Sequence, residues 1–381
     1  MKVLYMSRSD LFTKRGGDTV QIENTARELR GKNIEVEFYS GPMDLKSNKY
    51  DIVHIFNSYN VAETLCNIKI AKNLGKKVVL TPIYHPDFYL KNMLEAGIDK
   101  KKKFLFSFLS YQFYMTINNF IKDLVLNKRI NLSLLAQGYR IKRKKIFNSV
   151  DGILPNSQME KDYILKENNL KSPPFIQIIP NGVDNHIFNI VQNVREKKDK
   201  KIVCIGRIEP LKNQSLILKA FQQSVLYKDG YQLLFFGATN NNHHNYVEDF
   251  ITNVNRDPQV QYIGEVKQEV LFEHLSKARG LVHASWFETT GLIGLEAGIF
   301  EIPVVMTNSG FTKSYFKNNV IYCSPNDEVS IEHALNALQN INEEKVSELK
   351  KDIDNFYNWD YISGVTLSAY DTVLNKDYKE C

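Results

Sequence analysis

The sequence has few cysteines, no repeats and no low-complexity tract. Its 381 residues include only four cysteines, which lie far apart and form no C-x-x-C pair: Cys66, Cys204, Cys323 and Cys381. This spacing favours neither a zinc site nor a disulfide framework, and it fits a reducing compartment. We find no Gly-X-Y period and no repeat of about 20 to 50 residues, so collagen-like, disordered and solenoid architectures are excluded.

The N-terminus also lacks the apolar run of a secretory signal. One lysine and only a few apolar residues precede Arg8, which is too short for the apolar region of a signal peptide. We therefore expect a cytoplasmic protein.

The overall composition is that of an ordinary globular protein. Hydrophobic residues make up 43% of the chain and charged residues 24%. A chain of this length is too long for one compact core, so two domains are the default expectation.

The positive charge is concentrated in one segment. Residues 91–150 contain thirteen basic residues against three acidic ones, a net charge of +10 in a chain whose total is +6. Such a field favours an anionic surface, whether phospholipid, lipid-linked diphosphate or nucleic acid. No nucleic-acid-reading module is recognisable, so we expect no nucleic-acid partner.

The same segment contains an uncharged aromatic stretch, residues 104–121. Its 18 residues reach the lower limit for a spanning helix, but polar Ser, Thr, Gln and Asn side chains are scattered through it. We expect it to be interfacial or part of the core. With Lys100–Lys103 directly before it, the segment predicts peripheral attachment to the inner face of the plasma membrane.

Strand and helix patterns alternate over the first half of the chain. Short apolar strands are expected at residues 3–6, 34–39, 51–56, 77–81, 152–155 and 176–179. Helices are expected at 18–29, with Asp18 as the cap, at 61–74 and from Ser157. Short apolar strands joined by helices indicate a parallel sheet. We assign residues 1–184 to a first domain.

A second alternating set follows a polar, aperiodic linker at residues 185–200. Strands are expected at 201–205, 231–236, 260–263, 280–284 and 302–306, with a helix at 213–226. Residues 201–357 therefore form a second domain, and residues 358–381 a C-terminal helix that crosses back to the first. The predicted fold class is α/β, with two doubly wound, Rossmann-like parallel sheets facing a central cleft.

Two loops of the second domain carry candidate chemistry. Residues 206–213 follow a strand and precede a helix. The free backbone N–H groups at the start of such a helix can bind an anion. Arg207 and Lys212 add two cations suited to a diphosphate. Residues 287–298 also follow a strand, with Glu288 at the strand end and Glu296 about two turns later. Thr290, Gly291 and Leu292 begin a helix whose N-terminus permits close approach of a phosphate.

These motifs, in this order, resemble family 4 of the retaining nucleotide-sugar glycosyltransferases, which have the GT-B fold. The resemblance rests on Gly206 with Arg207 and Lys212 and on the Glu288-x7-Glu296 spacing about eighty residues later. Weaker supporting pieces span most of the chain: Gly16 and Gly17 after the first strand, residues 51–54, 155–157 and 179–184, and a tryptophan-containing C-terminal helix.

The resemblance implies a role for each of these residues. Arg207 and Lys212 would hold the donor diphosphate together with the amides of Gly291 and Leu292. Glu288 would contact the transferred sugar and Glu296 the ribose hydroxyls. Ile263 and Val266 would lie along the nucleobase, and Gly16 and Gly17 would let a first-domain loop approach the phosphates and the acceptor. The family's sugar-contacting histidine maps onto His85, with His54 as the competing candidate.

No general base for a double displacement is evident, so the implied mechanism is substitution on one face of the sugar. The departing phosphate would accept the acceptor's proton while Arg207 and Lys212 stabilise it. We expect no metal and no cofactor, because the one D-x-D string, Asp352 to Asp354, lies in a charged helical run.

The sequence predicts an enzyme that moves a sugar from a UDP- or GDP-linked donor to a hydroxyl of a glycan or lipid-linked acceptor in bacterial surface polysaccharide synthesis. Two alternatives stay open at this point. One is a nucleotide-sugar epimerase on the same fold, and the other is a non-catalytic protein that binds sugar nucleotides or membrane glycans.

Overall fold

The computed structural model describes residues 1–13, 15–39, 49–96, 110–127, 132–184, 187 and 198–375. The predicted membrane residues Lys100–Lys103 and the first part of the aromatic stretch, residues 104–109, lie outside these ranges. The chain forms two compact units. Unit 1 comprises Met1–Asn181 and Trp359–Cys381, and unit 2 comprises Gly182–Asn358.

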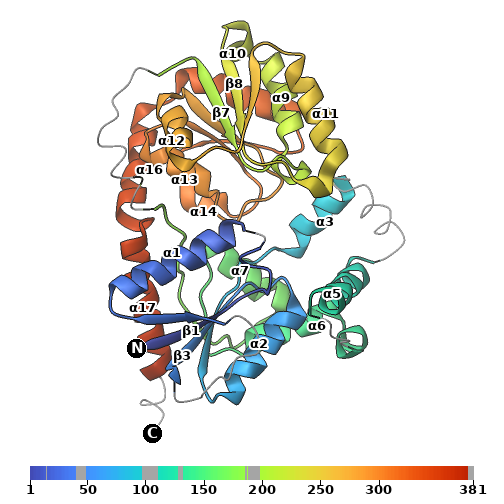
Figure 1. Cartoon of the computed structure of the whole chain (residues 1–381), viewed down its shortest axis with the longest axis vertical. Coiled ribbons are helices and arrows are strands. Elements are labelled where there is room, and N and C mark those ends of the chain that lie inside the picture. Colours follow the sequence, from blue (N-terminus) through green and yellow to red (C-terminus); the bar gives the residue numbers. More distant parts are fainter. Residues whose placement is uncertain are drawn as a thin grey trace. The chain divides into compact units, whose positions relative to one another are not determined.

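Unit 1 is a parallel sheet covered by helices (Figure 1). The strand order is β2-β1-β3-β4-β5-β6, and Val3 of the central strand β1 pairs with Val36 of β2 and Ile52 of β3. Apolar residues alternate between the two faces of the strands, so each face has its own core. The strands are β1 (Lys2–Met6), β2 (Glu35–Phe38), β3 (Ile52–Phe56), β4 (Lys77–Thr81), β5 (Gly152–Ile153) and β6 (Phe175–Ile176). The helices are α1 (Gly17–Gly31), α2 (Val61–Asn73), α3 (Asp87–Ala96), α5 (Tyr111–Asn127), α6 (Leu132–Asn148), α7 (Gln158–Asn168) and α17 (Trp359–Asn375).

Unit 2 repeats this architecture. Its sheet is also parallel, in the order β12-β11-β10-β7-β8-β9, with an apolar core on each face. The strands are β7 (Lys201–Ile205), β8 (Gln232–Phe236), β9 (Val260–Gly264), β10 (Gly280–His283), β11 (Val304–Thr307) and β12 (Ile321–Cys323). The α-helices are α9 (Gln214–Gln223), α10 (Val225–Lys228), α11 (His244–Asn255), α12 (Gln268–Lys277), α13 (Leu292–Ile299), α14 (Thr312–Phe316), α15 (Glu328–Ala337) and α16 (Glu343–Phe356), and 3-10 turns lie at Pro210–Lys212, Asn241–His243 and Leu338–Asn340. The predicted doubly wound α/β class is confirmed.

Two local predictions were wrong, and one element was missed. Asp18 is not a cap, because α1 begins one residue earlier and Gly16 occupies the N-cap, while Asp18 binds Arg8. The helix expected at residues 213–226 is interrupted at Ser224, whose backbone is extended and whose hydroxyl caps α10. The short edge strand β12 was not predicted.

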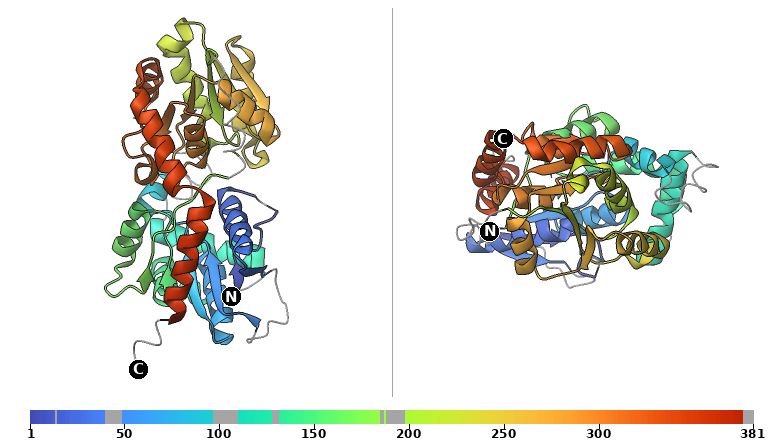
Figure 2. Two further views of the ribbon diagram at one scale, coloured as in Figure 1. Left: turned by 90° about the vertical axis from the view of Figure 1, so that its left-hand side faces the viewer. Right: turned by 90° about the horizontal axis from the view of Figure 1, so that it is seen from above.

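Helix α17 closes the core of unit 1 (Figure 2). Its Tyr370 hydroxyl lies 2.6 Å from Nδ1 of His54 on β3, and Nε2 of His54 lies 2.8 Å from the Thr81 hydroxyl on β4. Tyr370 also meets the Tyr5 hydroxyl of β1 at 3.2 Å. Burial lowers the pKa of His54 to about 3, so the imidazole stays neutral. Helix α17 is therefore bonded to β1 and β3 directly, and to β4 through His54.

Among the described residues, no helix is both long enough and apolar enough to cross a membrane. The described part of the aromatic stretch belongs to α5, which buries Tyr114 and Met115 and exposes Phe113 and Ile121. Its mixed exposure is that of a helix at the edge of the core.

We expect Tyr370→Phe to lower the free energy of unfolding by about 1–3 kcal/mol, because it leaves buried polar groups on β1 and β3 without a partner. Urea unfolding followed by circular dichroism measures this. Tyr361→Phe changes a half-exposed tyrosine on the same helix and should alter stability by less than about 0.5 kcal/mol. Equal effects of the two variants would contradict the anchoring role.

Candidate functional site

The candidate residues of unit 2 gather where the strand order reverses. From β7 the chain first adds β8 and β9 on one side, and then returns to place β10 on the other side of β7. The loops that leave the carboxyl ends of β7 and β10 therefore diverge and leave room for a ligand between them. Residues 206–213 form the first loop and residues 284–291 the second.

The β7 loop is held in place by Asn213. This residue has a left-handed backbone, with φ of 63°, and its side-chain amide donates to the carbonyls of Ala284 at 3.1 Å and Pro325 at 2.7 Å. Leu211 in the same loop accepts a hydrogen bond from the Trp286 amide at 2.9 Å. The two loops are thus tied together on either side of Lys212.

The β10 loop is fixed by a close backbone approach. Glu288 pairs with the segment after β11: its amide donates to the Ser309 carbonyl, and its carbonyl accepts from the Phe311 amide at 2.8 Å. A Cβ atom at Gly310, where φ is +109°, would overlap the backbone of Glu288. Only glycine permits this approach.

These loops bring together a polar cluster of four side chains. Nζ of Lys212 lies 2.6 Å from Oε1 of Glu288, and Nε2 of His283, the last residue of β10, lies 2.7 Å from the same oxygen. The Ser285 hydroxyl lies 3.0 Å from Nε2 of His283. Burial by itself would raise the pKa of Glu288, but Lys212 and His283 outweigh it and hold that pKa well below its usual range. Glu288 is therefore a carboxylate.

Arg207 does not join this cluster. Its side chain is about half exposed, and its guanidinium lies 3.7 Å from the Glu209 carboxylate. Gly206, just before it, donates its amide to the Phe236 carbonyl of β8. Of the two cations predicted for a diphosphate, only Lys212 contacts Glu288.

The N-terminus of α13 lies directly after Glu288. Gly291 is the N-cap, with φ of 80°, and Leu292 is the first helical residue. Thr290 is buried, and its hydroxyl lies 3.5 Å from that of Tyr315. The free amides of this helix start are suited to an anion.

Glu296 is the fifth of the eight residues of the same helix, and most of its surface is buried. Burial and the nearby negative charge of Asp184 raise its pKa to about 7. Unlike Glu288, it changes protonation state near neutral pH.

Ile263 lies in β9, the edge strand next to β8, and Val266 lies in the loop after it. Ile263 is near the end of β9 with 38% of its surface exposed, and Val266 packs partly against the core. An exposed apolar side chain at this edge can stack on a flat ring.

The candidate residues of unit 1 lie at the corresponding edge of its sheet. Gly16 is the N-cap and Gly17 the first residue of α1, in the loop after β1. His85 lies four residues after β4, is partly exposed, and its Nδ1 is 3.1 Å from the Ile83 carbonyl. His54 has both ring nitrogens bonded inside the core, which leaves neither for a sugar.

Sequence reasoning missed His283. It ends a buried strand and lies five residues before Glu288, and that position was the available signal, because the carboxyl ends of parallel strands carry the ligand-binding residues of such folds. Among the residues the structure describes, no three His, Cys, Asp or Glu side chains are grouped as metal ligands.

The chain is similar in part to known glycosyltransferases. Residues 186–355 match the model of the glycosyl transferases group 1 family. An uncharacterized glycosyltransferase of Methanocaldococcus jannaschii is 25% identical over 211 residues, covering 51% of this chain and 53% of that protein. The O-antigen chain mannosyltransferase RfbU of Salmonella typhimurium is 25% identical over 190 residues, covering 50% and 51%. The chain thus spans about half the length of the curated relatives it matches.

Solved structures match over nearly the whole chain. HepE of Anabaena, crystallised with UDP and glucose, superposes with a TM-score of 0.66 at 13% identity, covering 98% of this chain and 100% of that one. At this identity the likeness shows the fold alone. The chain therefore has a GT-B fold, and residues 186–355, most of its unit 2, match the glycosyl transferases group 1 model.

Proposed function

We propose that the protein is a retaining, metal-independent glycosyltransferase of family 4. It moves a sugar from a UDP- or GDP-linked donor to a hydroxyl of a glycan or lipid-linked acceptor in surface polysaccharide synthesis. The observation that carries the proposal is the contact of Lys212 with Glu288 at the strand-order reversal of unit 2, inside the segment that matches the group 1 model.

The geometry supports a division of labour between the two side chains. The Lys212 ammonium has three N–H donors and donates one hydrogen bond to Glu288, so the other two are available to a phosphate oxygen. Lys212 and His283 both contact the Glu288 side chain at Oε1. In the proposed reaction the second carboxylate oxygen of Glu288 accepts a hydrogen bond from a hydroxyl of the donor sugar.

The chemistry then needs no side chain as a nucleophile. The bond from the anomeric carbon to the diphosphate oxygen breaks, and the acceptor oxygen bonds to that carbon on the same face. The acceptor's proton passes to the departing phosphate. Lys212 and the amides of Gly291 and Leu292 stabilise the negative charge that grows on that phosphate. Arg207, whose side chain is exposed, would swing onto the diphosphate when the donor binds.

A thermal-shift screen with UDP- and GDP-sugars tests the proposal, because a true donor stabilises the folded state by mass action. With the donor so found, we expect Lys212→Ala to lower the single-turnover rate by about 100- to 1000-fold. Lys219→Ala, an exposed lysine on α9, should leave the rate unchanged. No stabilisation by any nucleotide-sugar, or an unchanged rate in Lys212→Ala, would contradict the proposed function.

Glu296 should make donor binding pH-dependent. Its ionised carboxylate accepts hydrogen bonds from the ribose hydroxyls better than the protonated carboxyl does. Because its pKa is about 7, the ionised fraction changes near neutral pH. Affinity should therefore rise as the pH increases from 6 to 8, by about tenfold, and level off above. Calorimetric titration with a UDP- or GDP-sugar is suitable, since the diphosphate diester of the donor has no ionisation of its own in this range. Glu296→Gln should abolish the pH dependence, and a pH profile identical to the parent's would overturn the assignment.

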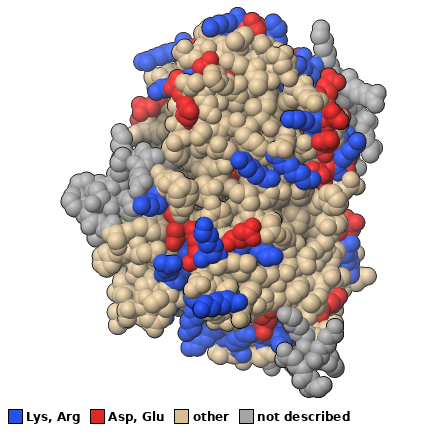
Figure 3. Space-filling model, turned by 180° about the vertical axis from the view of Figure 1, so that it is seen from behind, with Lys and Arg blue, Asp and Glu red and all other residues tan. Residues whose placement is uncertain are grey.

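We also propose that unit 1 rests on an anionic membrane through α5 and α6. Exposed apolar side chains on these helices include Phe113, Ile121, Val125, Leu132 and Ile141, of which Val125 and Leu132 are each 67% exposed. The basic residues of α5 and α6 that the structure describes include Lys122, Arg140, Lys144 and Lys145, and Figure 3 shows how Lys and Arg side chains are distributed over one face of the molecule. One predicted surface cation is internal instead: Arg143 is buried and forms a two-pronged contact with Asp87.

Replacing Val125 and Leu132 together with serine should weaken sedimentation with phosphatidylglycerol vesicles by about tenfold or more, since both side chains would lose apolar burial. Val329→Ser, an exposed apolar residue of α15, is the matched control and should bind as the parent does. Sedimentation of the double variant equal to the parent's, or no binding by the parent at low salt, would exclude this membrane face.

A further inference from the structure

The segment between β4 and α3 carries His85 and has a strained backbone. Ile83 has a φ of 48°, in the left-handed region that β-branched residues rarely adopt. Its carbonyl lies 3.1 Å from Nδ1 of His85. Because a carbonyl only accepts, Nδ1 carries the proton, and Nε2 of the neutral ring is an acceptor. The backbone of Ile83 therefore sets the tautomer of His85, and such a conformation persists only where the surrounding structure holds it.

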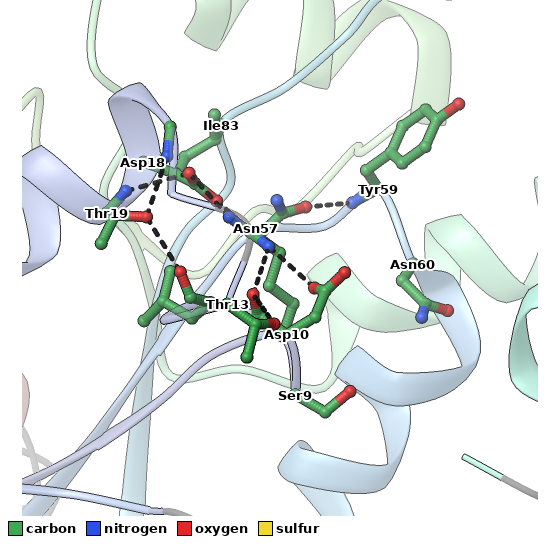
Figure 4. A network of polar contacts seen from close by, with 12 residues as sticks. Ser9, Asp10, Thr13, Asp18, Thr19, Asn57, Tyr59, Asn60 and Ile83 are labelled. Atoms are coloured by element: carbon green, nitrogen blue, oxygen red, sulfur yellow. Dashed lines mark hydrogen bonds and ion pairs between the residues drawn. The ribbon is translucent and has the colours of Figure 1, made fainter. Parts of the chain in front are cut away.

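The start of this segment is fixed by the loop after β3. The Asn57 amide donates to the Thr81 carbonyl at 2.9 Å, and the Ser58 amide donates to the Pro82 carbonyl at 2.8 Å. Figure 4 shows Ile83 together with Asn57 and Tyr59 of that loop. Further along, the ring of the proline at position 86 restricts His85 to an extended backbone.

Helix α7 presents two carboxylates to the same segment. Oε1 of Glu160 accepts from the Tyr84 amide at 2.6 Å, and Oε1 of Glu167 accepts from the Asp87 amide at 3.1 Å. Seven residues are close to two helical turns, so the two carboxylates lie on one face of α7. Tyr84 directly precedes His85, and Asp87, the first residue of α3, lies two positions after it. The histidine is thus placed between two backbone amides that a single helix holds.

Both carboxylates are themselves fixed by further contacts. Glu160 is fully buried, and its second oxygen accepts from the Asn156 amide at 2.5 Å, in the loop that leads from β5 into α7. Glu167 also accepts from the Tyr84 hydroxyl at 2.6 Å and lies 3.5 Å from the buried guanidinium of Arg143. Tyr84 is therefore held by its backbone and by its side chain. Neutral oxygens would satisfy the same N–H groups, so the use of two carboxylates points to a segment that must be held rigidly.

We propose that Glu160 and Glu167 are positioning residues that hold the His85 ring for its contact with a sugar in the proposed reaction. They act through the backbone of the segment and do not touch the sugar themselves. A ring displaced by about 1 Å can cost about 100-fold in rate, which is the effect that these contacts prevent. The sugar contact rests on the proposed function, whereas the positioning of His85 is argued from unit 1 alone.

Histidine-selective NMR on the full chain tests the positioning without any sugar. With 13C-labelled histidine, the Cε1–H signal of His85 is assigned from its loss in His85→Ala. Spectra are recorded at pH 8, where the Glu160 carboxyl, whose pKa burial raises to about 7, is ionised. In Glu160→Gln only one oxygen remains, so the Tyr84 or the Asn156 amide loses its acceptor. We expect the His85 signal to shift or broaden while the signals of the other histidines stay in place.

Glu167→Gln is the second variant, and it covers the case in which Glu160→Gln fails to fold, because Glu167 is only partly buried. Its single oxygen cannot serve both the Tyr84 hydroxyl and the Asp87 amide, so the His85 signal should change here too. Asp162→Asn is the matched control. Asp162 is an exposed acid of the same helix, and its carboxylate accepts from the Gln158 side chain, also on α7. This variant should leave the His85 signal at the parent's position.

Single-turnover kinetics with the donor from the nucleotide-sugar screen test the consequence for the reaction. Glu160→Gln should lower the rate about 10- to 100-fold. In the His85→Ala background the same change should lower the rate by less than about twofold, because the ring that Glu160 positions is already absent. A merely structural role would lower the rate by the same factor in both backgrounds.

An unchanged His85 signal in both glutamate variants, or an equal loss of rate in the two backgrounds, would overturn the proposal. Failure of the proposed function is read separately, from the nucleotide-sugar screen. A changed His85 signal without stabilisation by any nucleotide-sugar would keep the positioning of His85 by α7 and remove the transferase. Stabilisation by a nucleotide-sugar with an unchanged His85 signal would keep the transferase and remove the positioning role.

Discussion

In each sheet of this protein, the strand that comes first along the chain is not an edge strand but has neighbours on both sides. This single constraint determines where polar side chains can gather. A parallel sheet that grows first to one side of its opening strand and then to the other leaves two neighbouring strands whose following loops turn apart. In unit 2 these strands are β7 and β10, and in unit 1 they are β1 and β3. The polar cluster of Lys212 and Glu288 and, in unit 1, a cavity of about 230 Å³ lined by Ser7 and Asn60 occupy equivalent positions for this reason.

In unit 2, the space between the loops after β7 and β10 holds charged side chains in fixed positions. A carboxylate removed from water is stable only when donors surround it, and Lys212 and His283 supply them at 2.6 and 2.7 Å. The backbone arrangement that fixes these distances comes from residues with no charge of their own. Asn213 joins three segments through its amide, and Gly310 allows the Glu288 backbone to approach. Charge placement here depends on neutral loop residues.

The elements with strong patterns could be predicted from the sequence, and those whose identity depends on distant partners could not. Strands such as β7 and β8 are short apolar runs bounded by polar residues, so periodicity was enough to place them. The three-residue strand β12 exists because β11 is next to it, and its own sequence carries little signal. Asp18 looks like a helix cap until Arg8, ten residues earlier, draws it into an ion pair.

The residues of the candidate site also fall into those that could be predicted from the sequence and those that could not. Lys212, Glu288 and Glu296 stand in recognisable spacings, so they could be named in advance, whereas the exposed position of Arg207 and the contact of His283 with Glu288 depend on how loops fold. The two histidines of unit 1 differ only in burial: His54 is enclosed by Thr81 and Tyr370, and His85 is not. A single sequence carries no direct record of burial for a loop or strand histidine.

The bond between Tyr370 and His54 has a consequence for synthesis on the ribosome. Unit 2 is one continuous segment, so all of its residues are translated before α17. The first segment of unit 1 precedes unit 2 along the chain, but it needs α17, which follows unit 2, to cover the imidazole of β3 and the tyrosine of β1. The sheet of unit 1 therefore keeps His54 and Tyr5 uncovered by α17 while unit 2 is translated, and unit 1 is completed only after unit 2 has been made.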